Sequence, residues 1–267
     1  MSGAEAPAQG AAAAPAPGAA VAPVPGAAVD FAPGAAVAAA SGNAAAVAPG
    51  ATTLAPTALV DSDHPAVVAF SREHARGATD RERAVSLYLA VRDGFRYDPY
   101  RCDLSPAGMK ASRVIETGHG WCVTKAALLA AAARAAGIPA RLGYADVRNH
   151  LSTERMRQTM QTDLFVWHGY TELWLGGGWV TATPAFNAEL CERFGLLPIE
   201  FDGVHDSLYH PVDRAGRRHM EYVRQHGSFD DMPLARIVAD FAASYPALAQ
   251  AAPSASSFDA DVARETR

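Results

Sequence analysis

The sequence predicts an α+β domain in which helices precede an antiparallel sheet. Three observations support this fold class. Helix start and stop signals dominate residues 61–136, strand-like alternation begins near residue 140, and the clearest strand is followed by a glycine turn and a return strand. Helices that come first and hairpin-linked strands that come later are typical of α+β proteins, because antiparallel neighbours need only a tight turn between them.

Residues 1–60 differ in composition from the rest of the chain. The first 40 residues contain no lysine or arginine, and the motif PGAAV recurs at positions 17, 25 and 33. Frequent proline interrupts helices, and small side chains cannot build a core. We therefore predict a disordered Ala/Pro/Gly-rich tail over 1–60 and one domain over 61–267. No secretory leader is expected, because no basic segment precedes the apolar runs; a start codon assigned too far upstream would also produce such a tail.

Four helices are predicted before the sheet. The first begins near Asp63, which is a possible N-cap, and ends at Gly77. The second ends at Gly94 and the third at Gly118. The fourth starts at Cys122 and ends at Ala136. Their segments are 61–77, 79–94, 111–118 and 122–136, with a short extended piece at 95–100.

The helix that begins at Cys122 is the predicted centre of the domain. Its sequence, CVTKAALLAAAARAA, is apolar on nearly every side, which is typical of a buried helix. Cys122 would then sit at the first turn of a rigid element. The unpaired N–H groups of that turn favour a negative charge by about 0.3–1 kcal/mol, so a histidine partner is needed for a strongly reactive thiol.

The strands are predicted from alternation and turn chemistry. Residues 140–151 match a strand loosely, and 165–175 match one clearly, with His168, Tyr170, Glu172 and Trp174 on one face. Three glycines at 176–178 supply the turn, and 179–184 form the return strand. A last helix is predicted within 233–248.

Composition excludes several classes of function. A formal net charge of −5 and a pI of about 6.0 argue against nucleic-acid binding. Cys102, Cys122 and Cys191 form no zinc or disulfide spacing, which predicts reduced thiols in a cytoplasmic protein without a metal or cofactor. No apolar run reaches transmembrane length without proline or charge, so no membrane span is expected. The sequence makes no prediction of oligomeric state.

Among nine histidines, His168 is the preferred partner for Cys122. It lies on a well-patterned strand, whereas His119 lies in the approach loop and His150 follows a strand. The hairpin after His168 can also bring a third group back beside the imidazole.

Two segments carry a resemblance to a known family. Gly120-Trp121-Cys122 with the following alanine helix, and HGYTELWLGGGWVTATPAFN at 168–187, resemble the cysteine and histidine segments of the transglutaminase-like superfamily. The resemblance covers roughly 95–240. It implies a papain-like α+β core in which Cys122 is the nucleophile and His168 the general base.

One position departs from the family pattern. Relatives usually carry aspartate on the return strand, in W-x-x-x-D-P, whereas this chain has Trp179 through Thr183-Pro184. Alignment favours Thr183 as the third member, and chemistry favours Asn187, because an asparagine orients the imidazole in papain-like proteases. Both remain candidates.

The implied chemistry is attack of the thiolate on an amide or related acyl carbon, with an acyl-enzyme at Cys122. His168 protonates the leaving amine, and the Cys122 N–H is an oxyanion donor; the second donor is not assigned. Trp121, Asn149 and His150 are candidates for contact with a peptide, protein or small amide substrate, while Cys102 and Cys191 are expected to be structural. The alternatives are a silent binding module and an acyltransferase that uses a thioester donor, similar to arylamine N-acetyltransferases.

Overall fold

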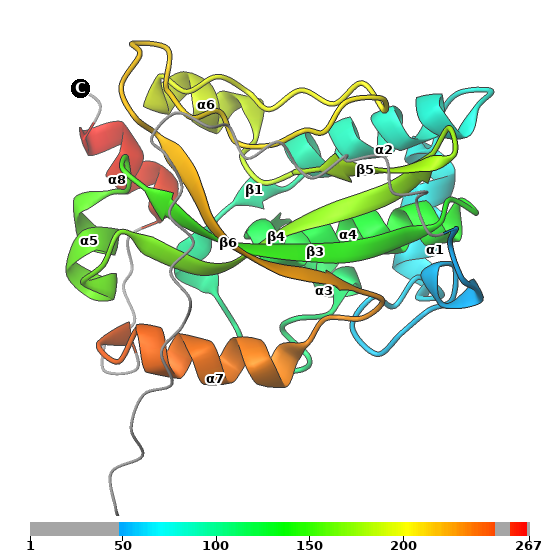
Figure 1. Cartoon of the computed structure of the whole chain (residues 1–267), viewed down its shortest axis with the longest axis horizontal. Helices are drawn as coiled ribbons and strands as arrows, with labels where there is room; N and C mark the ends of the chain where they lie inside the picture. Colours follow the sequence, from blue (N-terminus) through cyan, green and yellow to red (C-terminus); the bar gives the residue numbers. More distant parts are fainter. Residues whose placement is uncertain (1–47, 249–256, 266–267) are drawn as a thin grey trace, which may run out of the picture. The chain divides into compact units, whose positions relative to one another are not determined.

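The computed structural model describes residues 48–248 and 257–265. It confirms the α+β fold class, with helices packed on an antiparallel sheet (Figure 1). The helices are α1 (Pro65–His74), α2 (Asp80–Gly94), α3 (Ala111–Thr117), α4 (Cys122–Ala135), α5 (Glu154–Met160), α6 (Ala188–Phe194), α7 (Leu234–Ser244) and α8 (Phe258–Glu265). Two single-turn 3₁₀ helices are η1 (Ala51–Thr53) and η2 (Pro99–Arg101).

The main sheet has four strands in the order β5-β4-β3-β6, all antiparallel to their neighbours. Its strands are β3 (Ala140–Asn149), β4 (Leu164–Leu175), β5 (Gly178–Ala182) and β6 (Met220–Phe229). A separate parallel pair joins β1 (Arg96–Tyr97) to β2 (His119–Gly120). This short pair ties the segment after α2 to the residues just before Cys122.

Helix α4 is the central element. Its residues from Cys122 to Arg134 are all buried, and it packs on β3 and β4 and against α1, α2 and α3 (Figure 1). The Thr171 hydroxyl of β4 donates to Ala126 O at 2.8 Å, and the Ser71 hydroxyl of α1 donates to Ala132 O at 2.8 Å. The alanine surface lets its neighbours approach closely, as the sequence predicted.

A buried lysine fastens α4 to the end of α2. Lys125 Nζ donates to Arg92 O and Phe95 O, each at 2.8 Å, and thereby pairs carbonyls that the end of α2 leaves free. Burial lowers the pKa of Lys125 to about 7. The contact fixes the first turns of α4, and so the position of Cys122, against α2.

Helix boundaries follow local chemistry closely, but α1 differs from the prediction at both ends. It ends at His74, with Ala75 as its C-cap, and not at Gly77. Helix α1 is capped by His64, whose Nδ1 accepts from Ala66 N–H, and not by Asp63, because Pro65 occupies the first helical position. Helix α2 carries a capping box between Thr79 and Glu82. Gly118 adopts a positive φ of 71° and ends α3, as predicted.

The predicted tail lies mostly on residues 1–47, outside the described residues. Packed structure begins before the predicted boundary at 61, because Thr53, Leu59 and Val60 are buried. Arg134 Nη1 donates to Ala55 O at 2.9 Å. Helices α5, α6 and α8 and strand β6 were not predicted. Within 48–248 and 257–265, no helix is long and apolar enough to cross a membrane.

Candidate active site

Cys122 is the first residue of α4. The Thr124 hydroxyl accepts from Trp121 N–H at 3.1 Å and so fixes the backbone where the helix begins. A Cβ at Gly120 would lie 2.9 Å from Thr124 Oγ1 and 3.0 Å from Lys125 Cγ, so only glycine fits this approach. The glycine before Trp121 is therefore required for the chain to enter α4 tightly.

His168 is held by an irregularity in β4. The β3–β4 register shifts between Ala145 and Val147, and Trp167 has a positive φ of 60°. Asp146 Oδ1 accepts from Trp167 N–H at 3.0 Å and lies 2.6 Å from His226 Nε2. The His226 ring stacks on Trp167 with centroids 4.0 Å apart. The residue before His168 is thus fixed through both its backbone and its side chain.

Gly169 brings β4 against the start of α4. A Cβ at this position would lie 2.8 Å from Val123 Cα, so the two backbones meet because the side chain is absent. The Gly169 N–H interacts with the Cys122 thiol and lowers its pKa. His168 is the preceding residue, so the imidazole and the thiol come from adjoining positions.

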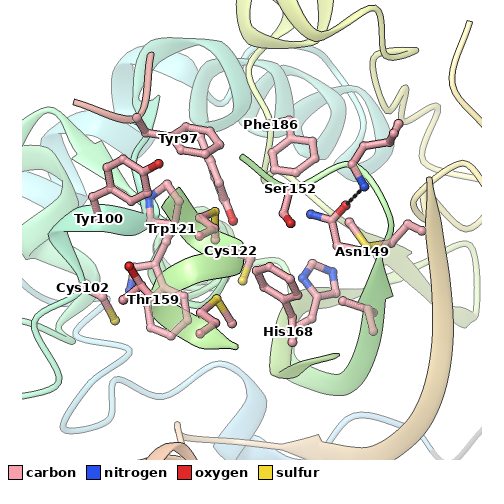
Figure 2. Close-up of a pocket in the computed structure, with 18 of the residues that line it drawn as sticks. Tyr97, Tyr100, Cys102, Trp121, Cys122, Asn149, Ser152, Thr159, His168 and Phe186 are labelled. Atoms are coloured by element: carbon pink, nitrogen blue, oxygen red, sulfur yellow. Dashed lines mark hydrogen bonds between the residues drawn. The ribbon is translucent and has the colours of Figure 1, made fainter. Parts of the chain in front are cut away.

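Both side chains open into one cavity of about 640 Å³ (Figure 2). Trp121 and Asn149, two of the candidates for substrate contact, also line it. Trp121 packs on Phe241 of α7 with ring centroids 5.7 Å apart, and Asn149 Oδ1 accepts from Leu151 N–H at 3.0 Å. The amide nitrogen of Asn149 makes no hydrogen bond among the described residues, which leaves it available to a substrate.

His150 lies outside this wall. Its Nε2 is 3.2 Å from Glu221 Oε2 on β6, and its backbone N–H donates to His219 O at 2.9 Å. The sequence placed Asn149 and His150 together, but β3 ends at Asn149, and His150 in the following turn contacts β6 and the segment before it instead of the cavity.

Tyr97 is a site residue that the sequence analysis missed. It lines the cavity, and its hydroxyl interacts with the Cys122 thiol. The parallel pairing of β1 with β2 carries it there, since Arg96 N–H donates to Gly118 O and Asp98 N–H to Gly120 O. Two-residue strands leave almost no periodicity in a sequence, and the extended segment at 95–100 was the one available signal.

The thiol and the imidazole are both neutral in the folded protein at pH 7. Burial raises the pKa of Cys122 to about 11, although the N–H groups of Gly169 and Val123 oppose the rise. Burial alone lowers the pKa of His168 to about 3. The sequence predicts that a histidine partner favours the thiolate. In the structure desolvation dominates, because both groups are almost fully buried.

Neither Thr183 nor Asn187, the two candidates for the third catalytic residue, forms a hydrogen bond with the imidazole of His168 among the described residues. His168 Nε2 and Thr183 Oγ1 are both buried without a hydrogen bond of normal geometry among the described residues. The β4–β5 register places Thr183 on the same face as His168, next to Tyr222. Asn187 lies elsewhere: its Oδ1 accepts from Tyr97 N–H at 3.3 Å, at the start of α6.

The other cysteines and the polar loop have simple placements. Cys102 also lines the cavity, whereas Cys191 is buried in α6. In the loop at 201–211, Asp202 Oδ1 accepts from Val204 N–H and His205 N–H, and Asp206 Oδ1 accepts from Thr181 N–H. These are loop-stabilising hydrogen bonds. Across 48–248 and 257–265, no group of three or more His, Cys, Asp or Glu side chains is arranged to hold a metal ion.

Comparisons with known proteins place this geometry in a family. A sequence model of the transglutaminase-like superfamily matches residues 68–184, which include Cys122, His168 and Thr183. No curated protein matches the chain. A crystal structure of a candidate cysteine protease from Cytophaga hutchinsonii is similar at 17% identity and a TM-score of 0.39, over 67% of this chain and 56% of that one. Residues 68–184, with Cys122 at a helix start and His168 on the sheet, belong to the transglutaminase-like superfamily.

Proposed function

We propose that the protein is a thiol-dependent amide hydrolase or acyltransferase that acts through an acyl-enzyme on Cys122. One observation carries this proposal. The thiol at the start of α4 and the imidazole of β4 face one cavity, joined through the contact of Gly169 with Cys122. A cysteine at a helix start beside a histidine is the arrangement that nucleophilic catalysis needs.

His168 acts as a general base at the moment of attack, because the resting pair is neutral. The thiol proton moves to His168 as Cys122 Sγ bonds to the acyl carbon, and His168 then returns that proton to the leaving amine as the C–N bond breaks. Attack by water on the thioester gives hydrolysis, and attack by an amine gives transfer.

Two donors stabilise the oxyanion in this scheme. The Cys122 N–H lies in the first turn of α4, where intrahelical partners are absent. We assign the second donor to the Tyr97 hydroxyl, because Tyr97 lines the cavity and its hydroxyl interacts with the Cys122 thiol. Thr183 and Asn187 are left without a catalytic role, and the site operates as a dyad of Cys122 and His168.

Trapping of the acyl-enzyme tests the proposal. Brief incubation with p-nitrophenyl acetate and intact-mass analysis should show one acetyl group on the wild-type protein, and peptide mapping should locate it at Cys122. Cys122→Ala should lose turnover by at least about a thousandfold, whereas Cys191→Ala should retain it. Acetylation distributed equally over Cys102, Cys122 and Cys191 would contradict the proposal.

A catalytically silent binding module is the second candidate function. The observation that favours it is that His168 Nε2 has no hydrogen-bond acceptor within residues 48–248 and 257–265, because an unoriented imidazole is a weaker base. The same trapping experiment separates the two functions, since a silent module acquires no acyl group on Cys122.

A further inference from the structure

The cavity around Cys122 has almost no charge. Among the described residues that line it, Arg155 is the one side chain with a permanent charge. Its guanidinium lies over the Tyr100 ring, 4.4 Å from the centroid, and its Nη1 is 3.9 Å from Asp261 Oδ2. Arg155 is therefore already engaged with an aromatic ring and a buried carboxylate, and it offers no free cation to a substrate.

The two histidines of the cavity are also uncharged at neutral pH. Burial lowers the pKa of His168 to about 3 and that of His219 to about 4. A substrate group with a carboxylate or an ammonium ion would lose its hydration inside this cavity without gaining an ionic partner.

The outer wall is built from flexible and aromatic apolar side chains. Helix α5 contributes Met156 and Met160, α7 contributes Phe241, and α8 contributes Phe258. Methionine adapts its shape to an irregular apolar guest. The polar groups near the thiol, by contrast, are few: Figure 2 shows Asn149 and Ser152 on the side of His168.

We infer that the acyl part of the substrate is an uncharged hydrocarbon chain, accommodated by this cavity with its carbonyl carbon at Cys122. The inference rests on the proposed function and specifies its substrate class. The polar groups beside the thiol suffice to bind one amide or ester group, and the remaining wall is suited to methylene groups. A large apolar pocket with a few convergent polar groups is the usual form of a site for such ligands.

A series of p-nitrophenyl esters tests the inference directly. Turnover of the acetyl, butyryl, hexanoyl and octanoyl esters by the full chain should give kcat/KM values that rise about fourfold for each added methylene until the cavity is filled. The hemisuccinate ester should react at least about 100-fold more slowly than the butyryl ester, because its carboxylate must be desolvated. A series that is flat or falls with length, with acetate still turned over through Cys122, would overturn the inference.

A carboxylate introduced into the cavity wall, compared with one introduced at the neighbouring exposed position, gives a second test of the inference. Thr159 lines the cavity from the last turn of α5, and Gln158 beside it is exposed. Thr159→Asp should lower kcat/KM for the octanoyl ester at least about tenfold more than for the acetyl ester, whereas Gln158→Asp should leave both unchanged. Both variants place a carboxylate in the last turn of α5, and Gln158→Asp also loses the hydrogen bond from Gln158 Nε2 to Glu154 Oε1, so the control carries the larger cost to helix stability. Equal behaviour of the two would count against the inference.

Binding to Cys122→Ala separates this inference from the proposed function. Calorimetric titration with butanamide, hexanamide and octanamide should show affinity that rises with length and a negative heat-capacity change. Length-dependent binding without any turnover by the wild type would refute the proposed enzyme and keep the apolar site. Length-independent binding, with turnover intact, would refute the apolar site alone.

Discussion

The two sides of the cavity are built differently. On the inner side, Cys122 and His168 come from α4 and β4, which pack tightly at Gly169 and are joined by the Thr171 hydrogen bond. On the outer side, short helices α5 and α8 and the helix α7 contribute single side chains from distant parts of the chain. In the proposed function, the inner side supplies the reacting groups, and the apolar outer side supplies the shape of the cavity. Substitutions on the inner side should therefore change the rate for every substrate, whereas substitutions on the outer side should change the preference for one acyl chain over another.

After removal of the nucleophile, removal of the Tyr97 hydroxyl should have the largest effect on catalysis by the inner side of the cavity. Tyr97→Phe should lower kcat/KM by about 10- to 100-fold for every ester, because it removes one oxyanion donor and changes no apolar contact. Steady-state kinetics across the ester series measure this. Tyr100→Phe is the control, since the Tyr100 hydroxyl is engaged with Thr153 and Asp261. A larger loss in the control than in Tyr97→Phe would place the donor elsewhere.

The third position of the inner side allows a gain of function. Thr183→Asp should raise kcat/KM by about tenfold, because a carboxylate on the face of His168 stabilises the imidazolium through a charge-assisted hydrogen bond. Thr183→Val, of nearly the same shape, should change the rate by less than about threefold, since among the described residues the hydroxyl makes no hydrogen bond to His168. Were Thr183→Val as damaging as His168→Gln, the hydroxyl would be orienting the imidazole and the dyad would be the wrong description.

Burial of uncharged histidines predicts a pH dependence of stability. The folded pKa values of His168 and His219, about 3 and about 4, lie below the unfolded value near 6.5. The unfolded chain therefore binds protons first as pH falls, so the free energy of unfolding decreases below pH 6.5 by up to about 1.4 kcal/mol per pH unit for each histidine. Their contribution is fully present above that pH.

Urea unfolding at pH 7, 6 and 5 measures how the free energy of unfolding changes with pH. The variant His168→Gln removes one of the two histidine contributions to this pH dependence. The slope of the variant should be smaller than that of the wild type. An identical slope in both would show that His168 is protonated in the folded protein at pH 5, contrary to the neutral pair.

The sequence predicted the inner side far better than the outer side. The α4 segment has local signals at both ends, and β4 with its glycine turn has clear alternation, so Cys122 and His168 could be paired before the structure was known. Residues such as Tyr97 and Phe258 reach the cavity through a two-residue strand and a C-terminal helix. Their placement depends on contacts between distant segments, such as that of Tyr100 with Asp261, which are 161 positions apart, and no local pattern encodes these contacts.

The state of the site was also beyond sequence reasoning. The helix start correctly predicts donors around the thiol, yet the extent of burial decides the sign of the pKa shift. Likewise, the return strand at 179–184 and the residues just after it presented Thr183 and Asn187 as alternatives, and only the fold places Asn187 on the Tyr97 backbone.

The most direct test of the central claim is the rate of Cys122 alkylation by chloroacetamide between pH 5 and pH 11, followed by peptide mass spectrometry in the wild type and in His168→Gln. The account predicts a rate in the wild type that rises with pH toward an inflection near 11. It also predicts that His168→Gln reacts at least about tenfold more slowly at pH 7–8, because the base that accepts the thiol proton is gone. A plateau below pH 7, which reports a preformed thiolate, or equal rates in the two proteins would contradict it.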